Sequence, residues 1–226
     1  MIDNIHRTLV SLYDSLPLSD RLYIRIRLLL SNLYLLESYV PQEGTILDLG
    51  CGHGLLSNLL AISSQKRQVL GIDIDAKKIS AAQRTIANRS NIKFEIGDAA
   101  LCCGSYDAIT IADMMYLIPP QTQRVILTNI ANALKPNGVL VWKTHSHQPR
   151  WKYAITYAQE WLMTKFGPTQ GSGIFFMDAE ESIQAIRTAG LYPVVVSMPS
   201  SLYSNILFLG FKTGVRSQES GDGSQE

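Results

Sequence analysis

The sequence has few cysteines, little net charge and no long apolar run, and each absence excludes a class of protein. Its 226 residues contain three cysteines, two of them adjacent. This odd count does not suggest a disulfide framework, so we expect a protein of the reducing cytoplasm. The formal net charge is +1, and no Lys/Arg cluster with interleaved aromatics marks a nucleic-acid groove. No apolar run reaches the roughly 18 residues that span a bilayer, and the start of the chain lacks the pattern of a signal peptide.

What the chain has instead is an alternation of short apolar runs and helical patterns from Thr45 to Lys143. This alternation predicts an α/β fold with a mostly parallel sheet. Residues 1–40 read as an N-terminal helical cap, residues 41–212 as the main domain, and residues 213–226, which are polar and rich in Gly and Ser, as a disordered tail. Near the end, two predicted strands separated by a short turn indicate an antiparallel pair. Asp75 and Asp178 have the positions of helix N-caps.

The segment "TILDLGCGHGLL" places glycines at alternate positions, 50, 52 and 54, between a predicted strand and a predicted helix. Glycines in such a turn permit positive φ and a close approach of the backbone to a ligand. Their spacing fits neither the G-x-G-x-x-G of dinucleotide sites nor a phosphate loop, which needs a lysine. This disfavours a nicotinamide oxidoreductase. Because Asp48 would repel a pyrophosphate, we expect a nucleoside that carries a positive group.

Four segments in order, "LDLGCGHG", "VLGIDIDAKK", "FEIGDAA" and "YDAITIADMMYLI", resemble the class I S-adenosylmethionine-dependent methyltransferase family. The resemblance implies a Rossmann-like, seven-stranded methyltransferase fold whose last hairpin strand is antiparallel, with S-adenosyl-L-methionine as cofactor. In such enzymes the glycine turn runs under the methionine part of the cofactor, and the acidic residue before it holds the amino group. A carboxylate after the second strand accepts hydrogen bonds from the ribose, the next residue packs on the adenine, and an Asp after the third strand meets the adenine amino group. The fourth strand ends beside the sulfonium. The cofactor-binding residues implied in this way are Asp48, Gly50, Cys51, Gly52, Gly54, Asp73, Ile74, Asp98, Ala99 and Asp113.

Catalytic residues are harder to name, because in-line displacement at a sulfonium mainly requires alignment of the acceptor, the methyl group and the sulfur. A base is needed only where the acceptor must lose a proton. His145, after the fifth predicted strand, is the candidate base, with His147 as a weaker one. Lys143 is a candidate for binding an anionic substrate group, and Tyr116 for orienting the substrate. The alternatives are exposed loop histidines, a lysine that reaches solvent and a tyrosine in the core.

We therefore infer methyl transfer to a small, fairly apolar or lipid-like acceptor, without a metal. An insert at residues 144–177, with the aromatic-rich segment "WKYAITYAQEWLMTKF", is predicted to face the substrate, and core packing is the alternative for its aromatic face. The N-terminal helices are a candidate for peripheral contact with a membrane surface. The competing function is a non-catalytic partner subunit that binds S-adenosylmethionine or S-adenosylhomocysteine. The acceptor atom and the oligomeric state are left open.

Overall fold

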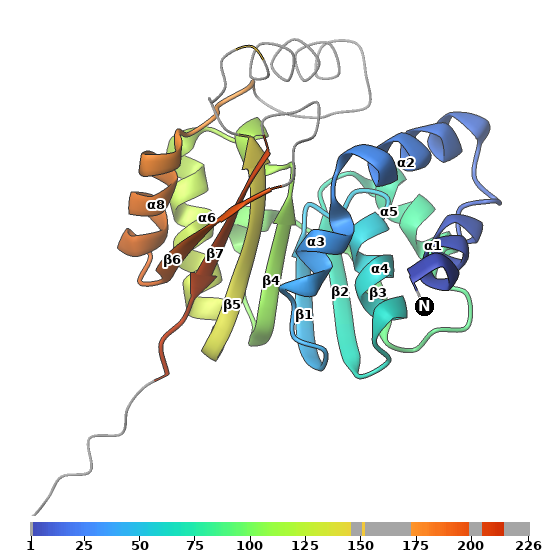
Figure 1. Cartoon of the computed structure of the whole chain (residues 1–226), viewed down its shortest axis with the longest axis horizontal. Coiled ribbons are helices and arrows are strands. Elements are labelled where there is room, and N and C mark those ends of the chain that lie inside the picture. Colours follow the sequence, from blue (N-terminus) through green and yellow to red (C-terminus); the bar gives the residue numbers. More distant parts are fainter. Residues whose placement is uncertain (1, 146–150, 152–172, 199–204, 215–226) are drawn as a thin grey trace, which may run out of the picture.

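A computed structural model describes residues 2–145, 151, 173–198 and 205–214 (Figure 1). In these ranges seven strands form one sheet in the order β3-β2-β1-β4-β5-β7-β6. Strands β1 to β5 pair in parallel, and β7 is antiparallel to both β5 and β6. The predicted mostly parallel α/β sheet, with its antiparallel final strand, is confirmed. The strands are β1 (Gly44–Leu49), β2 (Arg67–Asp73), β3 (Ile92–Ile96), β4 (Tyr106–Ala112), β5 (Leu134–His145), β6 (Tyr192–Ser197) and β7 (Asn205–Phe211).

The helices form two groups, with α1 to α5 on the right of Figure 1 and α6 and α8 on the left. Their bounds are α1 (Ile2–Ser11), α2 (Leu18–Leu30), α3 (Leu33–Ser38), α4 (Leu55–Ser63), α5 (Ala76–Arg84), α6 (Pro120–Ala133) and α8 (Ala179–Thr188), with single 3₁₀ turns η1 (Ala99–Leu101) and η2 (Met115–Leu117). Within the described ranges no helix has the length and apolar character needed to cross a bilayer.

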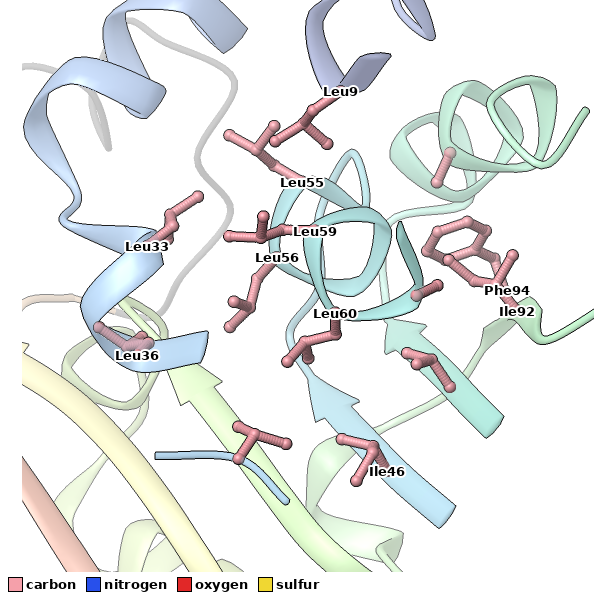
Figure 2. Packing of buried hydrophobic residues seen from close by; sticks show 14 of the residues in the cluster. Leu9, Leu33, Leu36, Ile46, Leu55, Leu56, Leu59, Leu60, Ile92 and Phe94 are labelled. Carbon is pink, nitrogen blue, oxygen red and sulfur yellow. The ribbon is translucent and has the colours of Figure 1, made fainter. Parts of the chain in front are cut away.

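The alternation of side chains along the strands divides the core between the two faces of the sheet. In β1, Ile46 belongs to the core beneath α1 to α5, whereas Leu47 and Leu49 belong to the core beneath α6 and α8. Helix α4 lies at the centre of the first core and is buried from Leu55 through Ala61. Figure 2 shows its leucines, Leu55, Leu56, Leu59 and Leu60, among Leu9 of α1, Leu33 and Leu36 of α3, and Ile92 and Phe94 of β3. A helix buried on all sides in this way needs the N-terminal helices as a cover.

Local signals in the sequence predicted two helix starts correctly. The Asp75 carboxylate accepts from the backbone N–H groups of Lys77 and Lys78, and Asp178 forms a capping box with Glu181, so both predicted N-caps are confirmed. Strand β5 starts at Leu134, which pairs with Tyr106 before a bulge in the β4–β5 ladder.

The order of the strands also defines where a ligand can bind. Strand β1 lies between β2 and β4, and the chain leaves β1 through α4 on one face and β4 through α6 on the other. Open α/β sheets bind ligands in the crevice beyond the carboxyl ends of strands at such a reversal. Most of the predicted insert lies outside the described residues, including His147 and all of the aromatic-rich segment except Trp151, and so does nearly all of the predicted tail.

Candidate functional site

A cavity of about 510 Å³ opens at the carboxyl ends of β1, β2 and β4, a volume in the usual range for small-ligand sites. Helix α2, which lies at this end of the sheet in Figure 1, forms part of its wall. The structure brings nearly all the sequence-predicted residues into the lining of this one cavity. Those that line it are Asp48, Gly50, Cys51, Gly52, Asp73, Ile74, Asp98, Ala99, Asp113, Tyr116, Lys143 and His145.

All three glycines of the turn after β1 have positive φ, at 69°, 56° and 75° for Gly50, Gly52 and Gly54. They differ in what a side chain would meet. At Gly52 an added Cβ would have no atom closer than 4.0 Å, so this position is open. At Gly54 it would lie 2.4 Å from the ring of Phe94. Gly54, which the family resemblance placed among the cofactor-binding residues, does not line the cavity and instead packs against the core.

Backbone hydrogen bonds hold the glycine turn against β2. The N–H groups of Gly50 and Cys51 both donate to the carbonyl of Ile72, at 2.8 and 3.0 Å. The N–H of Gly52 donates to Oδ2 of Asp73 at 2.8 Å. On the opposite side of the turn, the hydroxyl of Tyr13 in the N-terminal region donates to the carbonyl of His53 at 3.1 Å.

Asp73 ends β2 and has capacity for a ligand. Its two oxygens each accept one backbone N–H, Oδ1 from Asp75 at 2.9 Å and Oδ2 from Gly52. A carboxylate offers about four acceptor positions, so the oxygens retain lone pairs for hydroxyl groups in the cavity. Beside it, Ile74 is 65% exposed, a suitable position for an apolar contact with a planar ring. Asp98 caps η1 by accepting from the N–H of Ala100 at 2.8 Å.

Asp48 is buried between β1, β4 and α4. It accepts hydrogen bonds from Ser57 Oγ at 2.5 Å and from Thr110 Oγ1 at 2.8 Å. Burial raises the pKa of Asp48 to about 6, although both hydroxyl groups act in the opposite direction. Burial also raises the pKa of the neighbouring Cys51 thiol well above its usual value, with Asp48 adding to the effect, so this thiol stays protonated.

A cluster of charged side chains lines the part of the cavity beyond the end of β4. Asp113 follows β4 with φ 57°, and Lys143 Nζ lies 2.5 and 2.6 Å from its two oxygens. Arg27, from α2, contacts Asp113 Oδ2 at 3.0 Å. Burial alone would raise the pKa of Asp113, but the charges of Lys143 and Arg27 overcome it and hold the pKa far below its usual range. Lys143 is only 2% exposed, so the alternative of a lysine that reaches solvent is wrong.

His145 is the last residue of β5 and is buried, which corrects both its expected place after the strand and the alternative of an exposed loop histidine. Its Nε2 lies 3.9 Å from Oδ1 of Asp113. Its ring packs against those of Tyr116 and Phe176, with centroids 5.1 and 5.6 Å away. Burial lowers the pKa of His145 to about 4, because the nearby Asp113 offsets only part of the desolvation. His145 is therefore neutral at pH 7. Tyr116 is a core residue that also lines the cavity.

The sequence did not point to several side chains that the fold adds to this cavity, among them Arg27, Tyr23, His53 and Asn205. Helix α2 carries three arginines, and only the tertiary contact with Asp113 distinguishes Arg27 from Arg25. Asn205 enters through the β5–β7 ladder, where it lies opposite His145. Within the described ranges no group of three or more His, Cys, Asp or Glu side chains is placed to hold a metal ion.

Comparison with known proteins finds methyltransferases that are similar to this chain in sequence and others that are similar in fold. A family model described as a methyltransferase domain matches residues 46–138. The ubiquinone biosynthesis O-methyltransferase of Bordetella pertussis is 30% identical over 155 residues, which cover 66% of this chain and 62% of the relative. Among the first curated relatives, the matched regions cover between 46% and 65% of the relatives' own lengths.

Two solved structures share the fold at low sequence identity. The magnesium protoporphyrin IX methyltransferase of Synechocystis PCC 6803, solved with bound S-adenosylhomocysteine, superposes with a TM-score of 0.65 at 17% identity, covering 92% of this chain and 94% of that one. An O-methyltransferase family protein from Burkholderia thailandensis gives a TM-score of 0.69 at 16% identity, covering 85% and 57% of the two chains. The sheet order, the glycine turn and these matches agree: residues 46–138 match a methyltransferase domain, and the chain has the fold of the class I, Rossmann-like S-adenosylmethionine-dependent methyltransferases.

Proposed function

We propose that this protein transfers a methyl group from S-adenosylmethionine to a small, largely apolar acceptor. The observation that carries the proposal is the open glycine turn next to a carboxylate at the strand reversal. Gly52 has room above it, and its N–H is held by Asp73, whose oxygens face the same cavity. This arrangement suits an adenosyl ligand without phosphates.

The cofactor residues fall into three groups in this proposal. Asp73 accepts hydrogen bonds from the ribose hydroxyls, while Ile74 and Asp98 flank the adenine. The glycine turn lies under the methionine part. Arg27 and Lys143 provide positive charge near the carboxylate of the cofactor, and Arg27 brings this charge from the N-terminal helices.

The acceptor is proposed to bind beyond Asp113, against the rings of Tyr116 and Phe176. A neutral buried imidazole can accept a proton, so His145 is the proposed base for an acceptor that must lose one. Asp113, 3.9 Å away, would stabilise the imidazolium that forms. The printed names of the relatives, which refer to ubiquinone biosynthesis and to magnesium protoporphyrin IX, support a small apolar acceptor with a ring.

The outward face of α2 supports the expectation of peripheral contact with a membrane surface. Leu18, Leu22 and Leu29 are 77%, 58% and 79% exposed, and Ile26 connects this row to the cavity wall. Arg25 lies on the same exposed side and would meet anionic head groups. Co-sedimentation with phosphatidylglycerol vesicles tests this contact: Leu22→Glu should reduce binding, while Val125→Glu on α6 should not. Equal vesicle binding by both variants and the wild type would contradict the proposed membrane contact.

The central test is turnover. The protein is incubated with S-adenosylmethionine and a panel of phenolic, catechol, quinol, carboxylate and amine acceptors, and release of S-adenosylhomocysteine is followed. We expect release with at least one apolar ring-bearing acceptor. Tight cofactor binding with no release across the panel would instead favour the non-catalytic partner subunit.

A further inference from the structure

The N-terminal helices reach the glycine turn through a buried chain of hydrogen bonds. Arg89 Nη2 donates to Oδ1 of Asn58, and Nδ2 of Asn58 donates to the hydroxyls of Tyr13 and Thr85, each at 2.8 Å. The hydroxyl of Tyr13 then donates to the carbonyl of His53. Tyr13, Asn58 and Thr85 are each at most 1% exposed.

This chain of hydrogen bonds runs in one direction, from the donor Arg89 toward the glycine turn. Tyr13 has a single O–H, and the structure uses it for the His53 carbonyl, while the lone pairs of the same oxygen accept from Asn58. Burial raises the pKa of Tyr13 well above its usual value, so the hydroxyl remains a donor at any pH of interest. Hydrogen bonds in such a chain polarise and strengthen one another.

The hydrogen bond from Tyr13 holds a part of the glycine turn that the hydrogen bonds to β2 do not hold. The bonds from β2 fix the N–H groups of residues 50 to 52, whereas the His53 carbonyl points to the N-terminal region. His53 lines the cavity, and its ring lies against that of Tyr23 on α2, with centroids 5.4 Å apart. The turn is therefore held between β2 and the N-terminal helices, with its open face toward the cavity.

We propose that Tyr13 is a positioning residue for the cofactor: through the His53 carbonyl it fixes the glycine turn in the conformation that receives the ligand. This inference rests on the proposed function of the cavity. It adds a second contribution of the N-terminal region to cofactor affinity, besides the positive charge that Arg27 brings.

The test is Tyr13→Phe, which removes the hydroxyl and keeps the ring in the core. A net hydrogen bond of about 0.5–1.5 kcal/mol corresponds to a change of roughly 2- to 12-fold in an equilibrium constant. We expect the Kd for S-adenosylhomocysteine and the KM for S-adenosylmethionine to rise in this range, with kcat unchanged. Two variants are matched controls. Thr85→Val removes a hydroxyl from the same buried hydrogen-bond chain without touching the turn, and Tyr34→Phe removes a hydroxyl from α3 that lies 3.1 Å from Nδ1 of His6.

A loss of cofactor affinity in Tyr13→Phe, but not in Thr85→Val, supports the proposal, even where both variants lower the Tm. Equal affinity in Tyr13→Phe and wild type, or parallel losses in Tyr13→Phe and Thr85→Val, would show that Tyr13 only stabilises the fold. Amide hydrogen exchange in the ligand-free protein provides a second readout. Residues 50–54 should exchange faster in Tyr13→Phe alone, and unchanged exchange there would overturn the proposal. If wild-type protein binds neither form of the cofactor, the proposed function fails, and the exchange result still decides whether Tyr13 fixes the turn.

Discussion

Alanine substitutions at Gly52 and Gly54 should separate ligand binding from folding, although the two residues are neighbours in one turn. Both have positive φ, a conformation that costs a residue with a Cβ roughly 1–2 kcal/mol. At Gly54 the new methyl group would also lie 2.4 Å from Phe94 Cζ and 3.2 Å from Ala82 Cβ. Overpacking of this kind adds roughly 1–3 kcal/mol, so Gly54→Ala should lower the free energy of unfolding by about 2–5 kcal/mol.

At Gly52 the methyl group meets no atom closer than 4.0 Å, and it projects where Asp73 and Lys78 border the cavity. Gly52→Ala should therefore lose only the backbone contribution of roughly 1–2 kcal/mol in stability. Its cofactor affinity should fall about tenfold or more, because the methyl group occupies space proposed for the ligand.

Urea unfolding and calorimetric titration with S-adenosylhomocysteine measure the two effects separately. Gly190→Ala is the control for backbone strain, because this residue also has positive φ, at 90°, but no atom lies within 4 Å of the position of its Cβ. The reasoning would be refuted if Gly54→Ala and Gly190→Ala lost the same stability, or if Gly52→Ala bound the cofactor as tightly as wild type.

Three further predictions concern buried ionisable side chains. Asp113→Asn leaves the positive charges of Lys143 and Arg27 without their carboxylate, so urea unfolding should show a loss of about 3–5 kcal/mol; a change below 1 kcal/mol would contradict the described cluster. Because the folded-state pKa of Asp48 is raised to about 6, the contribution of Asp48 to the free energy of unfolding is present at low pH and is lost as pH rises from about 4 to 6. The free energy of unfolding of Asp48→Asn should therefore rise by roughly 2–3 kcal/mol relative to that of the wild type across this pH range. Stability curves that stay parallel across the range would contradict this prediction. His145→Gln should reduce turnover roughly 100-fold with a hydroxyl acceptor, and since the pKa of His145 is lowered to about 4, the wild-type rate should show no histidine limb between pH 5.5 and 8.

The sequence predicted those features that depend on neighbouring residues. The alternation of apolar and amphipathic segments predicted the sheet, and Asp75 and Asp178 predicted two helix starts because an N-cap acts within three residues. The positive φ of the glycine turn followed from the same local logic. The cavity residues at strand ends were found because parallel strands bring their carboxyl ends to one edge.

Contacts between distant segments were not predictable from one sequence. Arg27 meets Asp113 across 86 positions of the chain, and Tyr13 meets His53 across 40, with no periodic signal for either pair. The difference between Gly52 and Gly54 arises from the ring of Phe94, which belongs to a later strand. The residues around His145 have a composition typical of a polar loop, but the β5–β7 ladder buries this side chain.

Calorimetric titration of the wild type and of Asp73→Ala with S-adenosylhomocysteine tests the central claim most directly, with Asp178→Ala, at a helix cap that does not line the cavity, as the matched carboxylate control. The account predicts one site per chain in the wild type, affinity weaker by about 1–3 kcal/mol in Asp73→Ala, and wild-type affinity in Asp178→Ala. An absence of binding to the wild type, or equal affinity in the wild type and Asp73→Ala, would contradict it.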